Sequence, residues 1–155
     1  MKIRLLTITH KVPEWISLGF LDYAKRMPKH LKIELVEIPA EKQRSTKNIE
    51  VIMAKESEKM LHAIKPQDYC IALDIHGQQW STEELAQRFL IWQGKGQTIA
   101  FLIGGPEGLG PLCLLKAHEK WSLSKLTFPH AMVRILLAEQ LYRAYTLLQH
   151  HPYHK

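Results

Sequence analysis

The chain has 155 residues, 46% hydrophobic and 23% charged, which suits one globular core rather than a disordered or fibrous protein. The formal net charge of +6 favours polyanionic partners. No apolar run approaches the ~18 residues of a membrane span, and the apolar stretch at the N-terminus is too short for a signal peptide. Cys70 and Cys113 have no metal-type spacing and form no disulfide framework, so we expect a reduced, cytoplasmic protein without a membrane segment.

Strands and helices are expected to alternate along the chain, in the order in which hydrophobic periodicity changes. Strands are predicted at Lys2 to Thr9, Leu31 to Ile38, Tyr69 to Asp74 and Gln97 to Ile103, and a further segment from Trp121 to Phe128 ends at Pro129. Helices are predicted from Pro13 to Met27, from Ile49 to Ile64, from the capping box Ser81-Thr-Glu-Glu84 to about Gln93, briefly after Gly110, and from His130 to Gln149. Pro39 to Lys47 is predicted to be an exposed loop. The alternation predicts a single α/β domain over residues 1–155, with a mostly parallel central sheet flanked by helices.

Ligands of such sheets bind beyond the carboxyl ends of the strands. Three expected strand ends have unusual chemistry: Leu73-Asp-Ile-His-Gly77, Ile103-Gly-Gly-Pro-Glu-Gly108 and Leu123-Ser-Lys-Leu-Thr-Phe128. Four glycines and a proline between Gly104 and Gly110 indicate either a structural turn at a helix start or a backbone that lies against a ligand.

Several common kinds of site are not supported by the sequence. The glycine run has neither the Gly-Lys-Ser/Thr of a phosphate-binding loop nor the G-x-G-x-x-G dinucleotide pattern. No G-x-S-x-G nucleophile motif is present. The nine histidines are scattered without metal-ligand spacing, so we expect no metal.

The C-terminal segment is the second unusual feature. No acidic residue follows Glu139, whereas Arg143, Tyr153, His154 and Lys155 bring cationic, aromatic and titratable groups to the end of the chain. This combination suits contacts to phosphate together with base stacking. The alternative is a helix with core tyrosines and a frayed end, which fits Tyr153 and His154 less well because Pro152 ends the helix before them.

The combined motifs resemble the ribosomal RNA large-subunit methyltransferase H family of the SPOUT superfamily, and the similarity extends over the whole chain. The segments that resemble it are Leu73-Asp-Ile-x-Gly77, Leu102-Ile-Gly-Gly-Pro-Glu-Gly-Leu109, Ser122-Leu-Ser-Lys-Leu-Thr-Phe-Pro-His130, Val133-Arg-Ile-Leu-Leu-Ala-Glu-Gln-Leu-Tyr-Arg-Ala144 and Pro152-Tyr-His-Lys155. The resemblance implies an α/β domain with a C-terminal trefoil knot, and an enzyme that uses S-adenosylmethionine (SAM). It also implies a substrate, N3 of a pseudouridine in the helix 69 stem-loop of 23S ribosomal RNA on the assembled ribosome.

The resemblance also implies the site residues. Those expected to bind SAM are Leu73, Gly104, Gly105, Leu123, Ser124, Lys125, Leu126, Thr127 and Phe128. The candidate catalytic residues are Arg143, Tyr153 and His154; which group removes the N3 proton stays open. Transfer from a sulfonium requires no metal because the cofactor itself supplies the activated methyl group.

A homodimer is expected from the final helix, whose apolar stripe includes Val133, Leu137 and Leu141 while Ile135 and Tyr142 lie off that stripe. A helix that is apolar on more than one side needs a second covering surface. The resemblance implies the same, and with it a site shared between the tail of one subunit and the cofactor of the other. Two alternatives remain at this stage: a non-catalytic RNA-binding or ribosome-associated module, and a SAM-dependent methyltransferase that acts on another nucleic acid or a small molecule.

Overall fold

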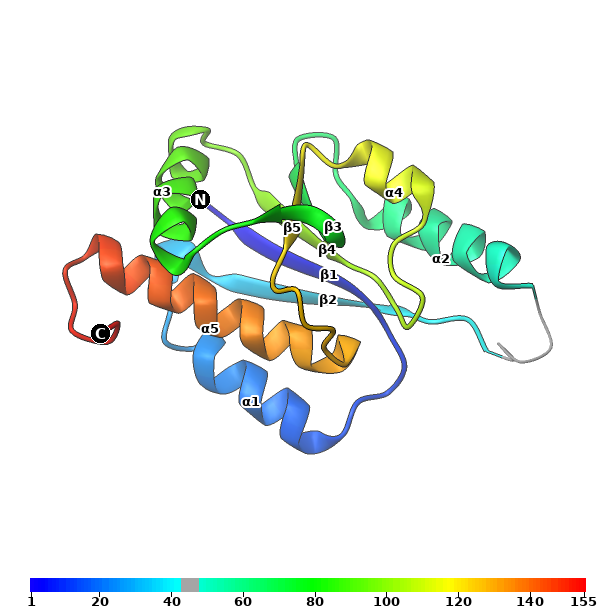
Figure 1. The fold of residues 1–155 in the computed structure, drawn as a ribbon, viewed down its shortest axis with the longest axis horizontal. Helices are drawn as coiled ribbons and strands as arrows, with labels where there is room; N and C mark the ends of the chain where they lie inside the picture. The colour runs from blue at the N-terminus through cyan, green and yellow to red at the C-terminus, as the bar shows by residue number, and fades with distance from the viewer. Residues whose placement is uncertain (43–47) are drawn as a thin grey trace.

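The computed structural model describes residues 1–42 and 48–155. Its centre is a sheet of five strands in the order β2-β1-β4-β3-β5, and every neighbouring pair is parallel (Figure 1). The strands are β1 (Ile3–Thr9), β2 (Ile33–Pro39), β3 (Tyr69–Gln79), β4 (Ile99–Ile103) and β5 (Glu119–Ser122). The predicted α/β class with a parallel sheet is confirmed. The trefoil knot stays a prediction from the resemblance.

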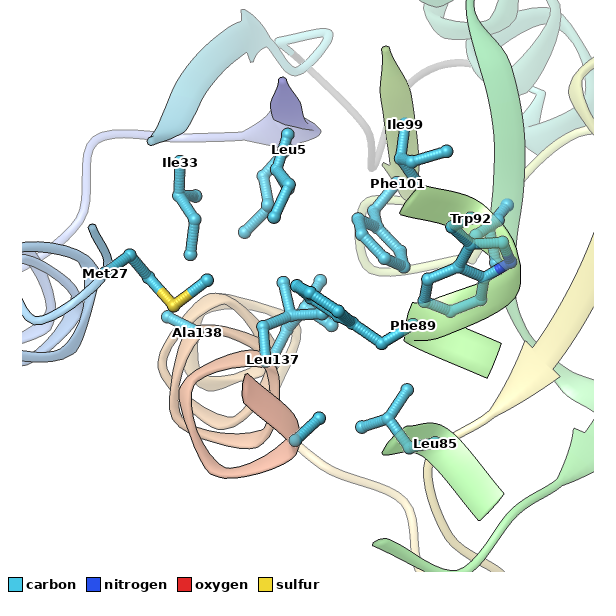
Figure 2. Close-up of a cluster of buried hydrophobic side chains, with 14 of the residues drawn as sticks. Leu5, Met27, Ile33, Leu85, Phe89, Trp92, Ile99, Phe101, Leu137 and Ala138 are labelled. Atoms are coloured by element: carbon cyan, nitrogen blue, oxygen red, sulfur yellow. The ribbon is translucent and has the colours of Figure 1, made fainter. Parts of the chain in front are cut away.

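Helices cover both faces of the sheet. One face packs against α1 (Glu14–Ala24), α3 (Thr82–Gly94) and α5 (His130–Leu148), and the other against α2 (Ile49–Ala63) and α4 (Pro111–Lys116); a short 3-10 helix, η1 (Lys29–Leu31), precedes β2. Figure 2 shows the larger core, in which Phe89 and Trp92 of α3 and Leu137 of α5 meet Leu5 and Phe101 of the sheet. Among the described residues, no helix is long and apolar enough to cross a membrane.

Most predicted elements agree with the structure to within a few residues. Ser81 begins α3 with both hydrogen bonds of the predicted capping box, and Gly94 ends that helix. The helix predicted from Pro13 to Met27 is shorter, because regular α-helix ends at Ala24 and a turn continues to Met27. The predicted exposed loop from Pro39 is wrong at its start, where Pro39 belongs to β2 and Ala40 is buried; residues 43–47 lie outside the described residues.

The third and fifth strands differ from the prediction. β3 does not end at Asp74 but continues to Gln79, with a register shift against β5 between Leu73 and Gln78. β5 is only four residues long, so Leu123 to Phe128 is a segment without helix or strand. Gly77 explains the continuation: a Cβ there would lie 2.6 Å from the backbone of Lys120 and Trp121, so only glycine lets the two strands approach so closely.

The final helix has more cover from its own chain than its sequence indicates. α5 lies between α1 and α3 on one face of the sheet (Figure 1). Ile135 packs on Gly19 of α1, where an added Cβ would come within 2.9 Å of its side chain, and Tyr142 packs edge-on against Tyr153. The apolar residues of α5 that were expected to need a partner subunit are therefore partly covered by other parts of the same chain. One exposed apolar stripe lies instead on α1, at Trp15, Leu18 and Leu21, each more than half exposed.

Candidate cofactor hollow and C-terminal cluster

The first and third predicted strand ends meet around a small hollow at the carboxyl edge of the sheet, which we call the cofactor hollow. It has a volume of about 120 Å³ and its walls come from β3, from the segment after β5 and from the first turn of α5. The lining residues are Leu73, Asp74, Ile75, Leu123, Ser124, Leu126, Thr127, Phe128 and Val133. The structure thus brings together every SAM-binding candidate of these two segments except Lys125, which is exposed and does not line the hollow.

Local hydrogen bonds hold the segment after β5 in place although it has no regular structure. The Ser122 hydroxyl donates to the carbonyl of Ser124 at 3.0 Å, and the Ser124 hydroxyl accepts from the Leu126 amide at 3.0 Å. Leu126 and Ile75 remain 71% and 72% exposed at the rim. A polar turn therefore presents apolar side chains to the solvent, which is the arrangement of a surface that is covered when a ligand or another chain binds.

The chemistry of this lining suits the adenine end of SAM. Apolar side chains surround a space with a few polar groups, namely those of Asp74, Ser124 and Thr127, as in sites for small planar ligands. The volume suits one ring system, because pockets for whole ligands of SAM's size measure about 300–1,000 Å³. The residues present therefore fit one part of the cofactor, and its remainder extends beyond this hollow.

The glycine run forms a tight turn after β4. The Gly108 amide donates to the carbonyl of Gly105 at 2.9 Å, and Gly108 has a φ of 82°, in the left-handed region that favours glycine. A Cβ on Gly104 would overlap the backbone of Gly108 and Leu109, and one on Gly105 would lie 3.3 Å from Ile8. The loop's own folding thus requires the bare backbone. Gly104 and Gly105 do not line the cofactor hollow, so their contact with SAM stays a prediction.

The three candidate catalytic residues form a second cluster, along the C-terminal half of α5, which we call the tail cluster. Glu139 is its centre: one carboxylate oxygen accepts from Arg143 Nε at 2.8 Å and from the Tyr153 hydroxyl at 3.1 Å. The Arg143 guanidinium also lies 4.8 Å from the centre of the Tyr153 ring. His154 connects the cluster to α3, with Nδ1 at 3.2 Å from Arg143 Nη1 and Nε2 at 3.0 Å from Glu83.

The contacts of the tail cluster set the donor and acceptor roles of its members. A guanidinium can only donate, so His154 Nδ1 accepts from Arg143, and Nε2 donates to Glu83. Burial and the hydrogen bond to Glu139 raise the pKa of Tyr153, and the hydrogen bond to Glu139 raises the pKa of Arg143. Tyr153 is therefore neutral and Arg143 charged near neutral pH, and in this arrangement neither Tyr153 nor His154 offers an unoccupied basic atom.

The cofactor hollow and the tail cluster are well separated within the chain. Val133 lines the hollow and Arg143 belongs to the cluster; ten residues of α-helix separate their Cα atoms by about 15 Å. In Figure 1 the chain enters α5 from the segment after β5, while the C-terminus lies beyond the opposite end of the helix. One chain alone therefore does not bring Arg143, Tyr153 and His154 to the hollow.

Sequence reasoning missed residues in both places. Asp74, Ile75 and Val133 line the hollow, and Asp74 and Ile75 directly follow Leu73 in a motif that was already singled out. Glu139 could have been found because it stands four residues before Arg143, the spacing of an ion pair on one helix face. Glu83 had no such signal, since 71 positions separate it from His154. Within residues 1–42 and 48–155, no group of three or more His, Cys, Asp or Glu could hold a metal ion.

A parallel α/β sheet with an apolar hollow beyond the carboxyl ends of its strands defines a protein of the ligand-binding, doubly wound class. Comparison with known proteins identifies the family. A family described as "Predicted SPOUT methyltransferase" matches residues 1–154. The chain therefore belongs to the SPOUT methyltransferase family.

Full-length relatives have a more specific name. A protein of Saccharophagus degradans is 49% identical over 155 residues, and one of Marinomonas sp. is 45% identical over 155 residues; each comparison covers 100% of both chains. Both are named "Ribosomal RNA large subunit methyltransferase H". The crystal structure of a probable methyltransferase from Bordetella pertussis has a TM-score of 0.55 at 16% identity, covering 92% of this chain and 93% of that one. At this identity the likeness shows the fold alone.

Proposed function

We propose that this protein transfers the methyl group of SAM to large-subunit ribosomal RNA, and that the acceptor is N3 of a pseudouridine in the helix 69 stem-loop of the assembled ribosome. The observation that carries the proposal is its full-length relatedness, at 45% and 49% identity, to proteins named for methylation of this RNA. The net charge of +6 suits a polyanionic substrate. The whole chain, residues 1–155, would act as one domain in the cytoplasm, where ribosomes are found.

The cofactor would bind at the carboxyl edge of the sheet. Leu73 and the segment Leu123 to Phe128 would hold the adenine part in the cofactor hollow, and the turn at Gly104 and Gly105 would shape the neighbouring wall. Bound SAM supplies an activated methyl group, so the chain's own task is to align the acceptor nitrogen with it and to exclude water. The exposed rim residues Ile75 and Leu126 would become covered in the complex.

The tail cluster would act on the acceptor base. N3 of pseudouridine carries an imide proton that must leave before or during transfer. Arg143, held in its charged state by Glu139, would stabilise the resulting anion. His154 would accept the proton only after Nδ1 is released from Arg143, and Tyr153 would contact the base or position Arg143.

A homodimer would unite the two parts. Because the hollow lies at the first turn of α5 and the cluster along its C-terminal half, the cluster of one subunit would meet the hollow of the other. The exposed apolar stripe of Trp15, Leu18 and Leu21 on α1 is a surface that such an association could cover. Light scattering measures the stoichiometry, and a monomer at micromolar concentration would contradict this arrangement.

Complementation tests the shared site. Thr127→Trp would fill the hollow from an exposed position, and removal of residues 153–155 would eliminate the tail of the cluster. Each homodimer should be inactive, whereas mixed dimers should regain one working site. Mixed dimers that demonstrably form without activity would show that hollow and tail belong to the same subunit.

The function itself is tested by incubating the purified protein with labelled SAM and ribosomes from cells that lack the gene, followed by location of the label. Label on N3 of the helix 69 pseudouridine would support the full proposal. Label elsewhere in the RNA would limit it to ribosomal RNA methylation. Binding without transfer would indicate a non-catalytic RNA-binding module, and transfer to a small molecule alone would contradict the RNA substrate.

A further inference from the structure

A second concave surface lies along the outer side of β5, apart from the cofactor hollow. Two adjoining hollows of about 510 and 480 Å³ share Gln78 and Arg88. We call this surface the edge groove; its polar lining residues are His76, Gln78, Gln79, Glu84, Gln87, Arg88, His118, Glu119 and Lys120. Because β5 pairs only with β3, the groove follows a free edge of the sheet.

The floor of the edge groove is held firmly. Trp80 stacks on Trp121 of β5 with ring centres 5.1 Å apart, and the Arg88 guanidinium lies 5.0 Å from the centre of the Trp80 ring. The close approach that Gly77 permits fixes the backbone of Lys120 directly against β3. The groove is therefore a preformed surface rather than a gap between loose segments.

The acidic residues of the groove are already engaged. Glu119 accepts hydrogen bonds from the Tyr69 hydroxyl at 2.9 Å and from Trp92 Nε1 at 3.0 Å, and it pairs with Arg88 at 3.5 Å. Glu84 accepts from the Ser81 amide at 2.8 Å in the capping box of α3. Arg88 is paired with Glu119, which leaves the ammonium group of Lys120 and the exposed side chain of His76 to face the solvent in the groove.

The groove also adjoins the proposed reaction centre along the chain. Leu73 to Ile75 line the cofactor hollow, and the next residues of the same strand, His76 to Gln78, line the edge groove. We propose that the edge groove binds backbone phosphates of the substrate ribosomal RNA on the way to the cofactor hollow, with Lys120 and His76 as contacts. This inference rests on the proposed function, and it assigns to that function a surface distinct from the tail cluster.

Lys120 could serve to protect the sheet edge from pairing with other strands instead of binding phosphate, and the experiment must distinguish these two roles. Lysines on free sheet edges prevent other strands from pairing there. Any charge serves that purpose, so Lys120→Glu would preserve edge protection but would repel phosphate. The same substitution therefore distinguishes the two roles, and Lys120→Arg serves as the conservative partner that keeps the charge.

The experiment measures binding of the full-length protein to ribosomes that lack the modification, together with methyl transfer and SAM affinity. Lys120→Glu should weaken ribosome binding and raise KM about tenfold with kcat within about twofold, and should reduce the slope of log affinity against log salt by about one. Lys120→Arg should restore both values, and SAM affinity should not change in either variant.

Lys55→Glu is the matched control, because Lys55 is an exposed lysine that does not line the edge groove. It lies on α2, which packs on the other face of the sheet from α3. If Lys120→Glu and Lys55→Glu weaken binding equally, or if Lys120→Glu leaves the salt slope unchanged, the edge groove does not contact RNA. Failure of the proposed function is seen separately, as a wild-type protein that binds ribosomes without transferring methyl groups.

Discussion

The two ends of α5 differ in how their side chains are satisfied. At the beginning of the helix, Val133 faces a hollow with mainly apolar walls, and the neighbouring Leu126 remains 71% exposed. In the C-terminal half and the segment that follows it, Glu139, Arg143, Tyr153 and His154 satisfy one another through hydrogen bonds of 2.8 to 3.2 Å. The first region is a hollow with exposed apolar walls, and the second is a set of polar groups that are paired with one another.

This difference indicates what each region needs in order to function. The hollow gains free energy when a ligand covers its apolar surface. Under the proposed function, the tail cluster would exchange its contacts within the chain for contacts with substrate. The separation of about 15 Å along the helix is the reason for proposing that the two regions meet across two chains.

The sharpest test of the comparison is removal of the tail. Deleting residues 153–155 should reduce methyl transfer at least about 100-fold, the scale expected when an acid, base or charge-stabilising group is lost. SAM affinity should change little, and thermal stability should fall modestly, because the deletion removes the contacts of Tyr153 with Tyr142 and Glu139 but leaves the main core intact. Quenched methyl-transfer assays measure the activity, and calorimetry measures SAM affinity and thermal stability. Full activity of the truncated protein would show the tail to be a frayed end.

A structural feature could be predicted from the sequence when it depends on residues that are close together along the chain, and could not when it depends on distant ones. Periodicity and capping residues are local, so the order of strands and helices was predicted correctly, down to the capping box at Ser81. The continuation of β3 past Asp74 depends on the close approach of Gly77 to Lys120, and the contact of Glu83 with His154 joins residues 71 positions apart. No local pattern predicts either. Leu73 and Leu123 to Phe128 were assigned to the cofactor through family resemblance rather than through periodicity.

The glycine turn provides the second test, with a control in the same chain. Gly104→Ala should lower the free energy of unfolding by about 1–3 kcal/mol, because the new Cβ overlaps the backbone of Gly108 and Leu109. Gly94→Ala, where an added Cβ meets nothing within 4 Å, should be neutral or stabilising by up to about 1 kcal/mol. Urea unfolding measures both.

The same pair of variants decides whether the turn belongs to the cofactor site. If it does, Gly104→Ala should also weaken SAM binding in calorimetry, at a temperature where the variant is folded, while Gly94→Ala should not. Unchanged SAM affinity in a destabilised Gly104→Ala protein would make the turn purely structural and limit the site to the cofactor hollow.

Filling the hollow should affect the cofactor and spare the tail. Thr127→Trp should weaken SAM binding at least about tenfold, equivalent to about 1.4 kcal/mol, because the indole would occupy space that the adenine needs. Lys125→Trp is the control, since Lys125 is exposed in the same segment without lining the hollow. Equal losses in both variants would mean that the segment, rather than the hollow, determines SAM affinity.

The smallest expected effect concerns the contact between the tail and α3. The pKa of Glu83 is lowered, first by its own backbone amide at the start of α3 and second by the hydrogen bond from His154. His154→Ala should therefore raise the pKa of Glu83 toward its ordinary value without reaching it, because the larger cause remains. A lowered carboxyl pKa stabilises the folded state above the ordinary pKa of the group, and this contribution is lost as the pH falls through the lowered value. The stability difference between wild type and His154→Ala should thus narrow on acidification.

NMR titration of the Glu83 carboxyl measures the change in its pKa, with His62→Ala on α2 as the control. A Glu83 pKa that is the same in wild type and His154→Ala would show that the tail does not rest on α3 in solution.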